Sequence, residues 1–167
     1  HGQVAGPVTL KYHAYRMNFV NPNPEMRISD AKPLSHYYNY FLGNDQSRWK
    51  NSIHPAMNVN YKNLYQQIDA HVYSENGNMK YDYIVHPGAN IKDLAFVYEG
   101  VDDIKIHKKC LSIQTSVGDN LEMVPYAYQY INDEKIEVPC EYVLEKNKMS
   151  FVVGKNYNPA YDLVIDP

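Results

Sequence analysis

The dipeptide Asn76-Gly77 constrains this chain more than any other feature, because it separates two runs rich in β-branched and aromatic residues. Both central residues of a type I′ turn need positive φ, which asparagine and glycine tolerate best. Pro87-Gly88 then ends the second run, since proline supplies no donor for a strand ladder. The sequence therefore predicts a β-hairpin over residues 68–85.

The register of this hairpin follows if Asn76 and Gly77 are the two loop residues. The predicted pairs are Glu75–Asn78, Tyr73–Lys80, Val72–Tyr81, His71–Asp82, Ala70–Tyr83, Asp69–Ile84 and Ile68–Val85. The face that carries Ile68, Val85 and, further along, Met79 is almost wholly apolar, so we expect it to lie on a core. The His71 and Asp82 face is the wetter one. Because a lone pair of strands is not stable, the rest of the chain must supply a partner sheet.

Short alternating or aromatic runs recur along the remaining chain, separated by turn residues. The clearest are residues 8–20, 26–28, 37–42, 57–61, 94–99, 104–107, 111–115, 121–124, 126–131, 135–138, 141–144, 149–153 and 162–166. Roughly a dozen short strands at 8–12-residue spacing predict an all-β fold, an antiparallel β-sandwich or irregular barrel. At most one or two helical turns are expected. The best, over residues 45–50, has Asn44 or Asp45 as its cap, with Trp49 pinning it to the sheet.

Two further hairpins are predicted near the C-terminal end. Asn132-Asp133 is the turn of one, between residues 126–131 and 135–138. Asn147-Lys148 is the turn of the other, which would bring Leu144 opposite Phe151 and Tyr142 opposite Val153.

The length and charge of the chain limit its function classes. At 167 residues we expect a single all-β domain over 1–167, excised or processed from a longer multidomain chain because it opens at His1 without a leader. A net charge of -3 and the lack of a basic run argue against a nucleic-acid partner. No segment has the length and apolarity of a membrane span, so we expect no membrane insertion.

Two cysteines, Cys110 and Cys140, allow one disulfide at most and define no disulfide framework. A bridge and a pair of packed free thiols both remain open, and we expect the thiols.

Several segments together resemble a known family. They are Tyr37–Asp45 with Trp49, Tyr61–Tyr65, Ile68-Asp69, Lys80–Ala89, Tyr98–Gly100, Pro125–Gln129 and Pro159 through Leu163–Pro167. This set, over about residues 12–167, is similar to an uncharacterised all-β domain near the N-terminus of large secreted Bacteroidetes surface proteins. Such proteins look gliding-motility-associated or adhesin-like. In them the domain precedes β-propeller-type, immunoglobulin-like or PKD-like repeats and a C-terminal sorting domain for type IX secretion.

The resemblance implies a location and neighbours, and no chemistry. It implies a secreted, extracellular protein at the cell surface. It also implies that the chain binds neighbouring domains, either of the same protein or of another surface protein. The family pattern usually begins some tens of residues earlier, so another segment is expected to complete the sheet. No catalytic or ligand residues can be carried over, and no cofactor is implied.

The predicted cross-strand pair His71 and Asp82 is the sharpest candidate for chemistry, with Asp69 and His86 on the same face. A histidine oriented by a carboxylate can act as a general base or metal ligand. A hydrolase would also need a nucleophile or a third ligand, and the sequence offers none of the usual motifs. A structural cross-strand pair is therefore the expectation.

Metal-binding patterns are weak. The seven histidines, His1, His13, His36, His54, His71, His86 and His107, have no ligand spacing, so no metal is expected. The acidic segments 102–103 and 119–122 lack a spaced calcium loop and are interpreted as solvated turns.

Two groups of aromatic residues could form platforms for sugar rings. Tyr37, Tyr38, Tyr40 and Phe41 form the first, and Tyr126, Tyr128 and Tyr130 the second. The spacing of two puts the second group on one face of a strand, where we expect a core role. If that face is exposed, its contiguous aromatics would instead mark an interface.

The sequence thus favours a non-catalytic structural or interaction module of a secreted cell-surface protein, active in adhesion, gliding-associated display or extracellular assembly. The alternative is a carbohydrate-binding module with an exposed tyrosine platform for surface glycans. A small hydrolase using His71 and Asp82 is the third hypothesis, and the fold alone cannot choose among them.

Overall fold

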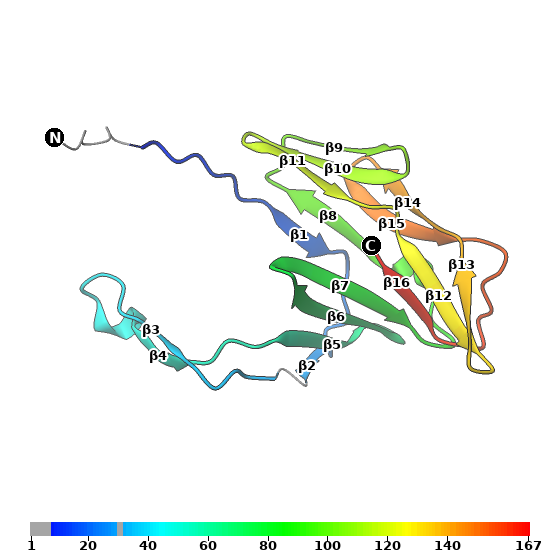
Figure 1. The fold of residues 1–167 in the computed structure, drawn as a ribbon, viewed down its shortest axis with the longest axis horizontal. Coiled ribbons are helices and arrows are strands. Elements are labelled where there is room, and N and C mark those ends of the chain that lie inside the picture. The colour runs from blue at the N-terminus through cyan, green and yellow to red at the C-terminus, as the bar shows by residue number, and fades with distance from the viewer. Residues whose placement is uncertain (1–7, 30–31) are drawn as a thin grey trace.

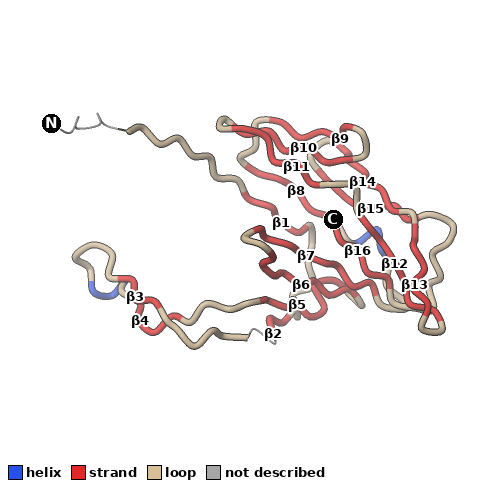
Figure 2. Tube along the Cα trace, in the orientation of Figure 1, coloured by secondary structure: helices blue, strands red, loops and turns tan. Residues whose placement is uncertain are grey.

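The computed structural model describes residues 8–29 and 32–167, and within them the protein is all-β (Figure 1). The strands are β1 (Arg16–Phe19), β2 (Arg27–Ser29), β3 (Tyr38–Tyr40), β4 (Lys50–Ile53), β5 (Asn58–Tyr65), β6 (Ile68–Glu75), β7 (Asn78–Val85), β8 (Ala95–Glu99), β9 (Asp103–His107), β10 (Cys110–Thr115), β11 (Gly118–Glu122), β12 (Tyr126–Ile131), β13 (Glu134–Val138), β14 (Cys140–Glu145), β15 (Lys148–Val153) and β16 (Leu163–Asp166). Two 3₁₀ turns, Gln46–Arg48 and Ile91–Asp93, are the helical pieces in Figure 2.

All strand pairs are antiparallel and form four sheets. A seven-stranded sheet has the order β13-β12-β16-β7-β6-β5-β2, and a four-stranded sheet has the order β1-β8-β15-β14. A three-stranded sheet, β11-β10-β9, and the pair β3-β4 complete the set. The two larger sheets pack through their aromatic residues, since the ring of Tyr83 lies 6.2 Å from Phe96 and 5.8 Å from Phe151. The predicted all-β antiparallel class is confirmed.

The central hairpin, β6–β7, has the predicted turn and register. Asn76 and Gly77 take φ values of 51° and 81°, and all seven predicted residue pairs occur. Ile68 and Val85 are fully buried, as expected for the core face. Met79 is 72% exposed, so its predicted place in the core is wrong, because burial of this face falls off toward the turn.

The β14–β15 hairpin differs from its predicted register. Tyr142 pairs with Phe151, so the two loop residues are Lys146 and Asn147. Lys146 takes positive φ, 60°, and Asn147 Nδ2 donates to the carbonyl of Tyr98 at 2.7 Å. This tertiary hydrogen bond favours the shifted turn, whereas the predicted Asn132-Asp133 turn of β12–β13 is confirmed.

The N-terminal strand is shorter than predicted. Its ladder begins only at Arg16, which pairs with Glu99 at the end of β8. Gly100, at φ 82°, ends the ladder while it still lies against Ala14 and Tyr15, and residues 8–15 form no strand. Val8, Leu10 and Tyr12 are all exposed in this segment.

Residues 32–57, here called the arm, extend away from the larger sheets (Figure 1). The arm begins as a ladder in which Leu34 N donates to Pro55 O at 2.7 Å, and it ends in β3 and β4. The predicted helical turn is present with Asp45 as its cap. The prediction that Trp49 pins this turn to a larger sheet is wrong. Its ring packs on Phe41 within the arm, with the two ring centroids 5.3 Å apart.

Candidate functional site

The outward face of the seven-stranded sheet carries a continuous row of polar and aromatic side chains. Tyr126 of β12 pairs with Asp166 of β16, and His71 of β6 pairs with Asp82 of β7. Because Ile165 pairs with Tyr83, Asp166 and Asp82 are neighbours across the same face. The row therefore runs from Tyr126, one of the predicted site tyrosines, through Asp166 to the predicted His71–Asp82 pair.

His71 and Asp82 occupy the predicted register, yet each is held by other residues. His71 Nε2 accepts from Asn58 Nδ2 at 3.2 Å, and its ring stacks on Tyr73 with centroids 4.9 Å apart. The Tyr73 hydroxyl donates to Asp82 Oδ1 at 3.4 Å. Burial and then the nearby Asp166 raise the pKa of Asp82. In the described part of the chain no hydrogen bond joins His71 to Asp82, so the carboxylate does not orient the imidazole.

His86, predicted on the same face, lies between two carboxylates. Its Nδ1 is 3.0 Å from Asp162 Oδ1 and its Nε2 is 3.3 Å from Asp69 Oδ2. Asp69 also accepts from Lys62 Nζ at 2.7 Å and from the backbone N–H of Asn63 at 2.8 Å. Burial alone would lower the pKa of His86, but hydrogen bonds to the two carboxylates raise it. Positive and negative groups therefore alternate from Lys62 through Asp69 and His86 to Asp162, and they link the β5–β6 end of the sheet to the residue before β16.

The tyrosines of β12 face outward, so their expected core role is wrong. Tyr126 is 40% exposed and Tyr130 is 59% exposed. The opposite face of β12 supplies the core, through Ala127 and the fully buried Gln129. Neighbouring rings touch, with centroids 5.6 and 5.7 Å apart, but the second pair is perpendicular at 86°. The strip is therefore stepped and not flat.

A groove of about 520 Å³ runs beside this strip, here called the tyrosine groove. Its lining residues are Ile84, Pro87, Tyr128, Tyr130, Ala160, Tyr161, Asp162 and Val164. Aliphatic side chains and tyrosine rings dominate the lining, and Asp162 adds the carboxylate that contacts His86. A mainly apolar, concave surface with one fixed polar group is typical of small-molecule sites.

The buried side chain of Gln129 fixes the far wall of the tyrosine groove. Gln129 was not among the residues that the sequence predicted for a site. The β12–β16 ladder stops at the Tyr128–Val164 pair. Beyond it, Gln129 Nε2 donates to the carbonyls of Asn158 and Tyr161 at 2.8 and 3.0 Å, and its Oε1 accepts from Asn158 N at 2.8 Å. The amide replaces the ladder and holds the loop against β12. In the sequence, Gln129 alternates with the tyrosines that face outward, and this pattern was the only indication that its side chain is buried.

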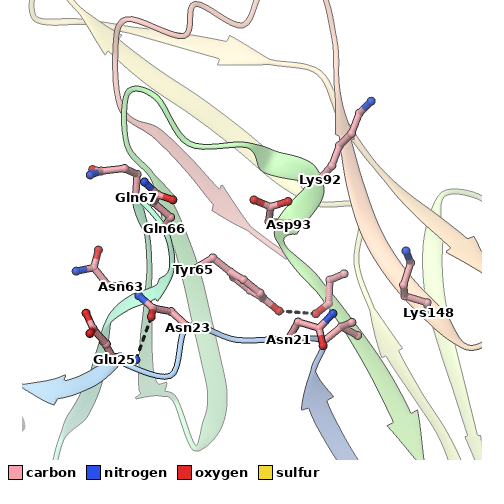
Figure 3. A pocket seen from close by; sticks show the side chains of 12 residues that line it. Asn21, Asn23, Glu25, Asn63, Tyr65, Gln66, Gln67, Lys92, Asp93 and Lys148 are labelled. Atoms are coloured by element: carbon pink, nitrogen blue, oxygen red, sulfur yellow. Dashed lines mark hydrogen bonds between the residues drawn. The ribbon is translucent and has the colours of Figure 1, made fainter.

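A larger hollow of about 640 Å³ lies where several loops meet (Figure 3). Carboxamides are prominent in its lining, including Asn21, Asn63 and Gln67, each with positive φ. At its base the Tyr65 hydroxyl donates to Ala95 O at 2.7 Å. Asn21, Asn63 and Gln67 are all exposed, so the tyrosine groove is the better-organised site.

Glu122, interpreted from the sequence as part of a solvated turn, places its carboxyl in the interior. The Tyr98 hydroxyl donates to Glu122 Oε1 at 3.0 Å, and Oε2 is buried with no hydrogen-bond partner among the described residues. Burial raises the pKa of this carboxyl. The alternating direction of side chains along β11 was the only feature of the sequence that could have indicated that Glu122 points into the interior.

The remaining predicted site residues lie elsewhere. Tyr37, Tyr38 and Tyr40 lie on the arm and not beside the β12 strip. Cys110 and Cys140 are free thiols, the expected alternative to a disulfide. Over residues 8–29 and 32–167 no cluster of three or more His, Cys, Asp or Glu side chains could hold a metal ion, and His1 lies outside these residues. None of the helical pieces in the described ranges is long and apolar enough to cross a membrane.

Comparison with known proteins gives one family and no named relative. No curated protein and no solved structure matches the chain. A family model covers residues 1–167. The chain therefore belongs to the family described as domain of unknown function DUF7948.

Proposed function

We propose that this chain is a non-catalytic interaction module of a secreted cell-surface protein, which binds a neighbouring folded domain through its arm. The observation that carries this proposal is the exposure of the arm. From residue 32 to residue 57 no side chain is buried, and only Leu34 and Pro55 are even half-buried. The exposed apolar residues are Tyr37, Tyr38, Tyr40, Phe41, Leu42, Trp49, Ile53 and Met57.

So many aromatic residues on a two-stranded arm are costly to leave in water. Each large side chain gains about 1.5–3 kcal/mol when it is fully buried. Contiguous exposed apolar surface usually marks an interface, and tyrosine and tryptophan are common in the centres of interfaces. Ring contacts pair Tyr38 with Tyr40 and Phe41 with Trp49 within the arm, so these aromatics form exposed clusters that a partner can cover.

The charge of the arm indicates the chemistry of the partner. Lys32, Arg48 and Lys50 are basic and only Asp45 is acidic, although the whole chain has a net charge of -3. A partner with an apolar patch edged by carboxylates would complement this surface. The resemblance described above supports a neighbouring domain of a secreted Bacteroidetes surface protein as that partner. Adhesion, gliding-associated display or extracellular assembly would be the context.

Hydrogen–deuterium exchange tests the proposal. Backbone amides of residues 37–53 are compared in the isolated chain and in the longer surface protein that contains it. We expect slower exchange in the longer protein. Phe41→Ser and Trp49→Ser should each abolish this protection, because they remove the apolar contact. Met79→Ser, at an exposed residue of the β6–β7 hairpin outside the arm, is the matched control and should not.

Three results would contradict the proposal. Equal exchange in the two proteins would show that no neighbouring domain covers the arm. Protection that rises with the concentration of the isolated chain would identify a second copy as the partner. Protection caused only by anionic lipid vesicles would indicate membrane binding.

A further inference from the structure

We infer that the tyrosine groove is a binding site for neutral oligosaccharides built of pyranose rings. This site is separate from the arm and goes beyond the interaction proposed for it. The groove combines aromatic walls, an aliphatic floor and one carboxylate. Pyranose rings have the complementary surface, with apolar C–H faces and hydroxyl groups around their edges.

The aromatic walls stand on two different segments. Tyr128 and Tyr130 come from β12, and Tyr161 comes from the loop that precedes β16. Ile84 and Val164 form the floor between them. A sugar ring seated here would cover aromatic surface on two sides, and its exclusion of water from the tyrosine rings would favour binding.

The polar group of the groove is already oriented. Asp162 Oδ1 is held by His86, whereas Asp162 Oδ2 makes no hydrogen bond within residues 8–29 and 32–167. A carboxylate oxygen accepts strong hydrogen bonds from hydroxyl groups. The Asp69–His86 contact and the Gln129 amide fix Asp162 and Tyr161 before any ligand arrives. Little conformational entropy should therefore be lost on binding.

The surroundings disfavour two other ligands. A peptide cannot add as a strand beside Ala127 and Tyr128, because these residues are paired with β13 on one side and with β16 on the other. Beyond Tyr128, the loop that Gln129 holds occupies the side of β12 that β16 has left. A cationic ligand would compete with the chain's own lysine, since Lys135 Nζ lies 3.8 Å from the ring centroid of Tyr128 and 4.8 Å from that of Tyr126. Tyr130 and Tyr161 remain available to a neutral ring.

Isothermal titration calorimetry with a panel of hexasaccharides tests the inference. The probes are cellohexaose, xylohexaose, mannohexaose and N-acetylchitohexaose, with an oligogalacturonate as the anionic comparison. We expect saturable binding of at least one neutral probe. Tyr130→Ala and Tyr161→Ala should each weaken it by about tenfold or more, which corresponds to about 1.4 kcal/mol. Asp162→Asn should weaken it less, because one carbonyl oxygen remains.

Tyr40→Ala is the matched control, because it removes an exposed tyrosine from the arm. It should leave the affinity within about twofold of the original chain. Circular dichroism of every variant verifies that it is folded. The inference is overturned if the folded chain binds none of the neutral probes at millimolar concentration. It is also overturned if Tyr40→Ala weakens binding as much as Tyr130→Ala, or if choline displaces the bound sugar.

Discussion

His86 Nδ1 lies 3.0 Å from Asp162 Oδ1, so the last residue before β16 is tied to the residue that follows β7. The contact sits beside the ladder in which Leu163 pairs with Val85. It continues the β7–β16 pairing through side chains where the backbone pairing ends. The same contact orients the carboxylate of the tyrosine groove, so one ion pair serves both the fold and the proposed site.

The pH dependence of stability should reveal this contact. The pKa of His86 is higher in the folded chain than in the unfolded one. Its stabilisation is therefore fully present below the unfolded pKa of about 6.5 and is lost as pH rises through the folded pKa. His86→Gln should lower the free energy of unfolding by about 0.5–1 kcal/mol at pH 5.5 and by less at pH 8.5. Urea unfolding at both pH values measures this difference.

His54→Gln is the control for this experiment, because His54 is an exposed residue of the arm whose Nδ1 contacts only a backbone carbonyl, that of Leu34, at 2.9 Å. It should show no comparable pH-dependent loss. An equal loss for His86→Gln at pH 5.5 and pH 8.5 would contradict the predicted role of the charged imidazole.

Glu122→Gln should stabilise the chain at neutral and alkaline pH. Because burial raises the pKa of Glu122, the folded state prefers the neutral acid, and stability falls as pH rises above the unfolded pKa. Glutamine carries no charge, and its amide can still form hydrogen bonds with the neighbouring hydroxyls of Tyr98 and Tyr81. We expect a gain of about 1–3 kcal/mol at pH 8 and a smaller gain at pH 4. Thermal unfolding followed by circular dichroism measures both.

Glu99→Gln provides the comparison, since Glu99 is exposed at the end of β8. Its effect should stay within about 0.5 kcal/mol at either pH. A loss of stability in Glu122→Gln at pH 8 would show that the buried carboxylate is stabilising, contrary to this prediction.

Two phenylalanines should differ sharply in their contribution to stability. Phe96 is fully buried between the larger sheets, whereas Phe41 is 57% exposed on the arm. Phe96→Ala should cost about 3–5 kcal/mol because it opens a cavity in the core. Phe41→Ala should change the free energy of unfolding by less than about 0.5 kcal/mol. Guanidinium unfolding of the isolated chain tests both, and a large effect of Phe41→Ala would mean that the arm packs on the body.

The sequence by itself determined the features that depend on neighbouring residues. Asn76-Gly77 specifies a two-residue turn, and the turn specifies the register of β6 and β7, so the His71–Asp82 pairing could be predicted. Alternation likewise predicted that Tyr126, Tyr128 and Tyr130 share one face of a strand. Local φ preferences and the period of two are properties of the chain alone.

Only the tertiary structure decided which face of β12 meets water, where Asn147 finds its acceptor and which loop carries Tyr161 and Asp162 to the tyrosines. Each of these depends on a contact between residues far apart in sequence, such as the Gln129 amide on the Asn158–Asp162 loop. The arm illustrates the same limit, since its aromatic sequence is typical of a core strand. Burial depends on which surfaces are available to cover a side chain, and that is a property of the assembled sheets.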